Sequence, residues 1–223
     1  MRMPVRTAVP IFCLGLAAFT GLFAAPALAA RAKQNQLEAA PAKPASRQAG
    51  ALAAWVTASR DNHNQPFVIV DKKDAQVLVF YPDGRLRGAA PALLGLSHGD
   101  ETVPGIGQRK LSTITPEERT TPAGRFVASL GNDLGQKNVL WVDYNAAISL
   151  HRVVTSNAKE HRLQRLMTPS ISDNRISFGC INVPAKFFDT VVEPSFTDTN
   201  GIVYILPDAK SIKSVFPESG VDD

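Results

Sequence analysis

The stretch from Pro66 to Ala89 constrains the fold most, because it alternates short apolar runs with turn residues. Residues 67–71 and 76–81 are rich in Val, Ile and aromatic side chains, which is typical of β-strands. Asp83-Gly84 lies between the second run and residues 85–89 and predicts a β-hairpin. Similar runs predict further strands over 124–130, 139–142, 146–151 and 201–206.

Helices are expected to be few and short. Residues 51–59 predict a helix that packs Trp55 on the domain, and residues 157–167 predict a second one. Pro184 fits the first turn of a third helix that runs to Val192. The sequence shows no β-α-β alternation, no repeat and no glycine-rich phosphate loop. We therefore expect a mainly β, sandwich-like domain with two or three short helices.

The first 29 residues are typical of a secretory signal peptide. Arg2 and Arg6 supply the positive start, an apolar stretch covers residues 9–25, and Ala27-Leu28-Ala29 places small residues before the cleavage point. The apolar stretch is shorter than the roughly 20 residues that a spanning helix needs. We therefore expect export to the periplasm or cell envelope, with no transmembrane anchor after cleavage.

The rest of the chain is expected to divide into four parts. Residues 30–50 are rich in Ala, Pro, Lys and Gln and predict a disordered tether. A short helix and linker over 51–65 precede the folded domain, 66–208, and a loose C-terminal tail, 209–223, follows it. Within the domain, Leu96–Thr120 is dense in Gly, Pro, Ser and Thr. A connection of that length in a compact domain is often functional.

Cys180 is the one cysteine outside the predicted signal peptide, because Cys13 lies in its apolar stretch. An unpaired cysteine in an exported protein is either a reactive thiol or an inert buried one. Gly179 beside it allows a tight turn, and the N–H groups of Gly179 and Cys180 are candidate oxyanion donors. The helix predicted to begin at Pro184 would favour the thiolate. These neighbours favour a nucleophile.

A thiol of ordinary pKa needs a base, and the sequence has four histidines. We interpret His63 and His98 as surface or loop residues. His161 lies opposite the apolar face of its predicted helix, whereas His151 ends an apolar strand and so has a rigid support. We favour His151 as the base, with His161 as the alternative.

Three stretches of the sequence together resemble a known family. Residues 67–84 contain hydrophobic alternation, a Gln, an aromatic residue and a Gly turn. Thr121-Pro122-Ala123-Gly124-Arg125-Phe126 is similar to a Thr-Pro-x-Gly-x-Phe segment, and Ser177-Phe178-Gly179-Cys180-Ile181-Asn182 is similar to a Ser/Thr-His-Gly-Cys-apolar-Arg/Asn nucleophile motif. On these motifs, Phe67 to Leu206 resembles the L,D-transpeptidase catalytic domain, the YkuD-like family of bacterial cell-wall enzymes.

The resemblance implies a β-sandwich-like fold and acyl transfer through a cysteine thioester. In the family, the cysteine attacks the carbonyl between the third and fourth residues of a peptidoglycan stem tetrapeptide. D-Ala leaves, and an amine of a second stem peptide accepts the acyl group, which gives a 3–3 cross-link. Matched by motif, Cys180 is the nucleophile, His151 the base, and Ser177 the residue that orients the imidazole. Gly179 then helps to hold the oxyanion, and Asn182 orients the substrate.

The sequence departs from the family pattern at two points. Phe178 occupies the position of the second motif histidine, which makes the pocket more apolar. His151 precedes Cys180 by 29 residues, whereas His161, at 19, is closer to the usual spacing. Arg152 and Arg175 flank the predicted site and are candidate ligands for a substrate carboxylate.

The expected partners are peptidoglycan stem peptides, together with carbapenems that acylate the thiol. No metal or cofactor is expected, because the acidic residues lack ligand spacing. Without the signal peptide the chain has 22 basic and 20 acidic residues, and the basic excess lies in residues 30–50, so a nucleic-acid surface has little support. A thiol hydrolase or carboxypeptidase on the same substrate, and an inert envelope-binding homologue, remain the alternatives. The sequence leaves the oligomeric state open.

Overall fold

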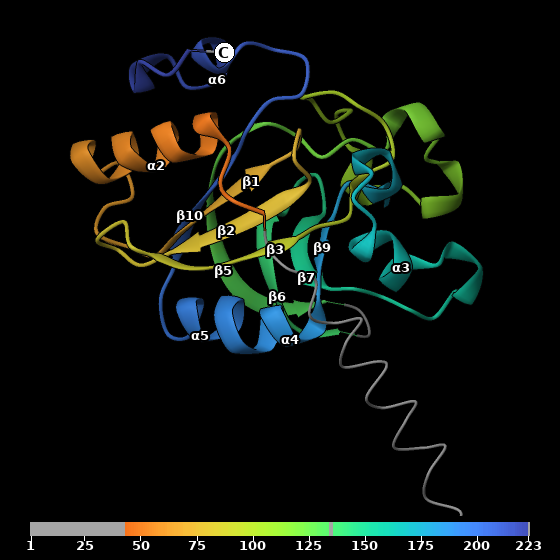
Figure 1. Cartoon of the computed structure of the whole chain (residues 1–223). Coiled ribbons are helices and arrows are strands. Elements are labelled where there is room, and N and C mark those ends of the chain that lie inside the picture. The colour runs from red at the N-terminus through yellow and green to blue at the C-terminus, as the bar shows by residue number, and fades with distance from the viewer. Residues whose placement is uncertain (1–42, 134–135, 223) are drawn as a thin grey trace, which may run out of the picture.

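A mixed β-sheet forms the centre of the molecule (Figure 1). The computed structural model describes residues 43–133 and 136–222, so the predicted signal peptide lies outside the described residues. Eight strands pair in the order β3-β2-β1-β10-β5-β6-β7-β9, and two short strands, β4 and β8, form a second sheet. The mainly β class with short helices is confirmed. The strands are β1 (Phe67–Asp71), β2 (Gln76–Phe80), β3 (Leu86–Pro91), β4 (Leu94–Gly95), β5 (Gly124–Asp133), β6 (Gln136–Asp143), β7 (Ile148–Arg152), β8 (Arg175–Ser177), β9 (Ile181–Val183) and β10 (Gly201–Ile205).

The main hydrophobic core is enclosed by both halves of this sheet. Alternate residues of β1 and β2, among them Val68 and Val77, belong to the same buried cluster as Leu150 of β7 and Ile181 of β9. Because side chains alternate across a strand, each strand contributes every second residue to this core. The two halves therefore face one another across the core, in a sandwich-like arrangement.

A second core lies on the opposite face of β1, β2 and β10. Helix α2 (Arg47–Ser59) covers this face with Leu52 and Val56, which explains why β1 and β2 are buried on both faces. Ser46 caps the helix by accepting a hydrogen bond from Ala49 N at 3.1 Å. The helix predicted over residues 51–59 is confirmed, and it begins four residues earlier, at Arg47. The expected tether is wrong for residues 43–50, because α2 begins at Arg47 and packs on the sheet.

The C-terminal segment also belongs to the second core, so its expected looseness is wrong. Helix α6 (Ile212–Val215) and the 3₁₀ turn η7 (Pro217–Ser219) follow β10, and Ile212, Phe216 and Val221 are buried against α2 and the sheet. Figure 1 shows α6 beside α2, with α4 and α5 on the far side of the sheet.

Strands β8 and β9 were not predicted, although they flank the candidate nucleophile. β9 pairs in parallel with β7, with Leu150 opposite Ile181 and His151 opposite Asn182. The helix expected at Pro184 is confirmed and consists of α4 (Ala185–Phe187), the π-helical turn η6 (Phe188–Val192) and α5 (Glu193–Phe196). β9 separates this helix from the thiol, so the helix start is not adjacent to Cys180.

The segment 157–167 is interrupted, and it is not one helix. A 3₁₀ turn, η4 (Ala158–Glu160), ends at His161, whose backbone is left-handed with φ 50°, and α3 (Arg162–Met167) begins directly after it. No helix of the described residues is long and apolar enough to cross a membrane.

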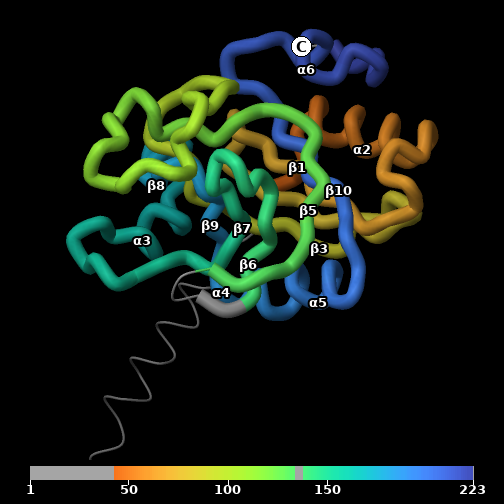
Figure 2. The backbone as a smooth tube through the Cα atoms, turned by 180° about the vertical axis from the view of Figure 1, so that it is seen from behind, coloured from red at the N-terminus to blue at the C-terminus, as the bar shows by residue number. Residues whose placement is uncertain are grey.

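The segment 96–120 is ordered and packs on the main core (yellow-green to green in Figure 2). It contains three 3₁₀ turns, η1 (Ile106–Gln108), η2 (Leu111–Thr113) and η3 (Pro116–Glu118), and Ile106 and Ile114 are buried in the core. A capping box closes η3, since Thr115 and Glu118 bond to each other's backbone. Arg109 pairs with both carboxylate oxygens of Glu118, at 2.7 and 3.1 Å.

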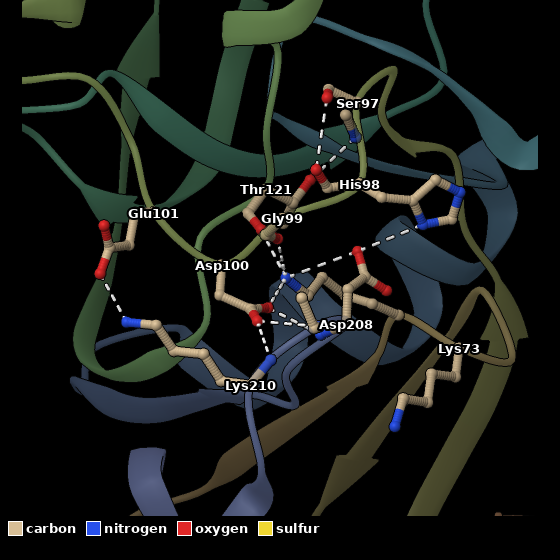
Figure 3. Close-up of polar contacts among 12 residues, drawn as sticks. Lys73, Ser97, His98, Gly99, Asp100, Glu101, Thr121, Asp208 and Lys210 are labelled. Carbon is tan, nitrogen blue, oxygen red and sulfur yellow. Dashed lines mark hydrogen bonds and ion pairs between the residues drawn. The ribbon is translucent and has the colours of Figure 1, made fainter.

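A buried ammonium holds both ends of this segment. Lys72 Nζ is fully buried and donates to Gly99 O at 2.6 Å, to Thr121 O at 2.8 Å and to Asp100 Oδ1 at 2.7 Å, with Asp208 Oδ2 at 3.7 Å (Figure 3). A buried charge is tolerated when it is paired and hydrogen-bonded in this way. Lys72 therefore fastens the start and the end of the segment to β1.

Asp100 connects the same cluster to the C-terminal segment, and this makes stability depend on pH. Burial alone would raise the pKa of its carboxyl, but hydrogen bonds from Lys72 and from the backbone N–H groups of residues 208–210 lower that pKa to about 2. A depressed carboxyl pKa gives stability that is present above the unfolded pKa and lost as the pH falls through the folded pKa. We expect this carboxylate to contribute on the order of 1–2 kcal/mol at pH 4, most of which is lost by pH 2.

Urea unfolding of the wild type and of Asp100→Asn between pH 2 and pH 5 tests this expectation. The variant is expected to unfold more easily at pH 5 and to lose this part of the pH dependence. Asp198→Asn is the control, because Asp198 is exposed and its left-handed backbone suits Asn. An Asp100→Asn protein with the wild-type slope between pH 2 and pH 4 would contradict the assignment.

Candidate active site

The candidate nucleophile lies in a tight turn between β8 and β9. The Ser177 hydroxyl donates to Cys180 O at 2.6 Å and accepts from Gly179 N at 3.1 Å, so it closes the turn from inside. Ser177 was expected to orient the imidazole, and the structure instead gives it the role of shaping the turn. The Gly179 N–H, expected as an oxyanion donor, is already bonded to this hydroxyl.

Only glycine fits at position 179. Its φ is +132°, and a Cβ there would lie 2.7 Å from Ile148 Cδ1 and 2.8 Å from Thr120 O. Ile148 and the end of segment 96–120 fill the space on this side of the turn, so Gly179 allows the tight turn but leaves no room here for a substrate. That segment consequently packs directly against the nucleophile turn.

Thr121, the first residue of the Thr-Pro-x-Gly stretch, fixes the turn from the other side. Its fully buried hydroxyl accepts from Gly95 N at 2.8 Å and donates to Gly179 O at 2.8 Å. Lys72 binds the carbonyl of the same threonine. A continuous set of hydrogen bonds therefore connects the buried ammonium to the residue before Cys180.

His151 lies on β7, in the strand that pairs with β9. Because His151 is opposite Asn182 and the chains run parallel, Ser149 of β7 is adjacent to Cys180. Alternation along β7 places Ser149 and His151 on one face, so both point to the side of the sheet that carries the thiol. His151 is 7% exposed. His151 is therefore buried on the strand next to the one that follows Cys180, and its role as the base stays a prediction.

The tautomer of His151 follows from its neighbours. Nδ1 lies 2.7 Å from Arg152 O, which can only accept, so Nδ1 carries the proton. Arg162 donates to Asn182 Oδ1 at 2.7 Å, which orients the amide, and Asn182 Nδ2 then faces His151 Nε2 at 3.5 Å. Nε2 therefore has the lone pair, as a general base requires.

Asn182 supports the imidazole from within the protein. It is 1% exposed, and Nδ2 also donates to Cys180 O at 3.3 Å. Its predicted role as a substrate-orienting residue is not what this position allows, since its amide is turned toward protein groups. Arg162, which positions that amide, was missed in the sequence because an arginine at a helix start is usually solvated.

The thiol and the imidazole are both neutral at pH 7. Burial raises the pKa of the Cys180 thiol, and the hydrogen bonds from Ser149 oppose this. Burial likewise lowers the pKa of His151, against the effect of the Arg152 carbonyl. The thiol lies 3.5 Å from Ala147 O, to which it donates, and 3.8 Å from Ser149 Oγ, which donates to it. The thiol and the imidazole therefore do not form an ion pair at rest.

Ser149 is therefore expected to tune the thiol. Its fully buried hydroxyl is a donor that favours the thiolate, so Ser149→Ala removes part of that stabilisation. We expect the midpoint of the curve of alkylation rate against pH, measured for Cys180 with iodoacetamide, to rise by about 0.5–1 pH unit. Ser172→Ala, an exposed serine, is the control and is expected to keep the wild-type profile. An unchanged profile in Ser149→Ala would contradict the role.

The other predicted site residues lie away from the thiol. His161 is exposed at the start of α3. Arg152 binds Asp189 and Glu193 on the helical side of the sheet, as alternation next to His151 requires. Arg175 is buried and binds Lys72 O and Asp208. The expectation that Arg152 and Arg175 bind substrate is therefore wrong, because both are engaged in ion pairs within the fold.

A cavity of about 90 Å³ opens beside the thiol. Phe178, in the position of the motif histidine, and Ile148 form its apolar wall next to Cys180. Segment 96–120 supplies much of the remaining lining, including Ile106, Leu111 and Ile114. The predicted apolar character of the pocket is confirmed.

The sequence matches no protein-family model and no curated protein sequence. The fold is similar to the helical cell shape determining protein Pgp2 from Campylobacter jejuni, with a TM-score of 0.43 and 15% identity over 71% of this chain and 56% of that chain. It is also similar to the L,D-transpeptidase from Xylanimonas cellulosilytica, with a TM-score of 0.38 and 17% identity over 63% of this chain and 60% of that chain. The L,D-transpeptidase from Mycobacterium smegmatis matches with a TM-score of 0.34 and 16% identity over 63% of this chain and 58% of that chain. This chain spans less than two thirds of the length of each of these proteins.

Proposed function

We propose that this protein is an exported cysteine acyltransferase that acts on peptidoglycan stem tetrapeptides. In the proposed reaction, Cys180 forms a thioester with the third residue, D-Ala is released, and an amine of a second stem peptide takes the acyl group. The observation that supports the proposal is the parallel pairing of β7 with β9, in which His151 lies opposite Asn182, two residues after Cys180, the only described cysteine. The three sequence motifs supply the substrate class.

The proposed steps use the groups of the site in order. The Cys180 sulfur attacks the carbonyl carbon while His151 Nε2 takes the thiol proton, which gives a tetrahedral intermediate. The C–N bond then breaks, and the imidazolium returns the proton to the departing amine of D-Ala. The acceptor amine repeats these steps on the thioester, and the thiol is regenerated. The Arg152 carbonyl, which accepts from Nδ1 in both protonation states, keeps the imidazole in one orientation throughout.

The products formed from a disaccharide-tetrapeptide test the proposal. We expect mass spectrometry to detect free D-Ala together with a cross-linked dimer. D-Ala release without dimer would replace the proposal with a thiol hydrolase or carboxypeptidase. Absence of both products would favour an inert envelope-binding protein.

A further inference from the structure

One guanidinium beside the candidate site has no carboxylate partner among the described residues. Arg119 is half-buried near the end of segment 96–120, where Nη2 donates to Ile114 O at 3.2 Å. Its Nε is buried and bonds to no group of the described residues. Arg109, in the same segment, contrasts with it, because Glu118 binds both of its terminal nitrogens.

Phe178 holds this guanidinium near the nucleophile turn. The Arg119 guanidinium carbon lies over the Phe178 ring, 4.0 Å from its centroid, and Phe178 lines the cavity together with Cys180. A guanidinium stacks well on an aromatic face, and this contact limits where its N–H groups can point. The phenylalanine that replaces the motif histidine therefore brings a fixed positive charge to the site.

An unpaired, partly buried cation is expensive, and a ligand can compensate that cost. Burial removes water from the guanidinium, while the cation–π contact and one carbonyl supply little negative charge. Glu117 is exposed and forms no ion pair with Arg119; hydrogen bonds from its own backbone N–H and from Thr115 are the main causes that lower the pKa of its carboxyl, and the charge of Arg119 contributes least. Arginine binds a carboxylate through two parallel hydrogen bonds, and Arg119 retains the donors for such a contact.

We propose that Arg119 binds the terminal carboxylate of the acyl donor, that is, the carboxylate of the residue that leaves. This inference rests on the proposed function. The terminal carboxylate is the anion closest along the peptide to the attacked carbonyl, one residue away. Arg119 stacks on Phe178, which lines the cavity together with the thiol, and it is therefore a specificity-determining residue for donors that end in a free acid.

The test compares two donors in three proteins. The donors are a stem tetrapeptide with a free C-terminal carboxylate and the same peptide as its C-terminal amide, and the readout is kcat/KM for release of the last residue. We expect the wild type to prefer the acid by about 10- to 100-fold, the size of a charge-assisted pair. Arg119→Gln is expected to lose that preference by lowering kcat/KM for the acid alone. Arg85→Gln is the control, because Arg85 is exposed and pairs with Asp83, and this variant is expected to keep the preference for the acid.

The acid-to-amide ratio does not depend on how much of a variant is folded, so a destabilised Arg119→Gln protein remains informative. A ratio in Arg119→Gln equal to that of the wild type would overturn the role of Arg119 while leaving the proposed function intact. A wild type that releases no residue from either donor would overturn the proposed function, and this inference with it.

Discussion

Cys180→Ala is expected to lose acyl transfer completely, with a fall in the rate of D-Ala release of more than about 1,000-fold. The substitution removes the only described thiol, and neither Ser149 nor Ser177 replaces it, because their hydroxyls are bonded within the fold. Product release from the tetrapeptide, followed by mass spectrometry, measures the loss. We expect the free energy of unfolding to change by about 1 kcal/mol or less, because the removed group is small and half-buried.

Ser172→Ala, which changes an exposed serine, is the control for this variant and is expected to release D-Ala at the wild-type rate. Thioester chemistry at Cys180 would be contradicted if Cys180→Ala released D-Ala at a rate near that of the control.

His151→Ala is expected to reduce kcat/KM by about 100- to 10,000-fold, because the variant loses the group that accepts the thiol proton. Burial holds the pKa of His151 below its ordinary value of 6.5, so activity in the wild type is expected to persist below pH 6.5 and to fall as the imidazole is protonated. The measurement is kcat/KM against pH for the wild type and the variant. The acid limb of that profile is expected to disappear in His151→Ala.

His161→Ala is the matched comparison, because His161 is exposed and lies directly before α3, outside the β7–β9 pair. We expect its kcat/KM to stay within about threefold of the wild type. Loss of activity in His161→Ala together with retention in His151→Ala would reverse the assignment of the base. Urea unfolding of both variants separates this outcome from a loss of folded protein.

Local sequence patterns were sufficient to predict most strands of the large sheet. The hairpin around Asp83-Gly84 and strand β10 follow from runs of apolar residues bounded by turn residues. Strands β8 and β9 were missed because three residues are too few to show a period. Ile212 and Phe216 are spaced by four residues, a helical signal that could have placed the C-terminal segment on the second core.

The nucleophile and the base of the candidate site could be predicted from the sequence, whereas the residues that position them could not. Cys180 and His151 follow from motif and strand-end arguments, whereas their adjacency depends on the parallel pairing of β7 with β9 across a long intervening segment. Arg162 and Ser149 become relevant only through that pairing. Arg175 was wrongly predicted to bind substrate because it is close to Cys180 in the sequence. In the structure it pairs with Asp208 and belongs to the buried ionic cluster.

The mass of the intact protein after brief incubation with a stem tetrapeptide tests the central claim most directly. An acyl-enzyme adds the mass of the peptide minus D-Ala, and peptide mapping is expected to place that addition on Cys180. The adduct is expected to be cleaved by hydroxylamine, as a thioester is, and to be absent from Cys180→Ala. Release of D-Ala without any such adduct, or an adduct on another residue, would contradict nucleophilic catalysis by Cys180.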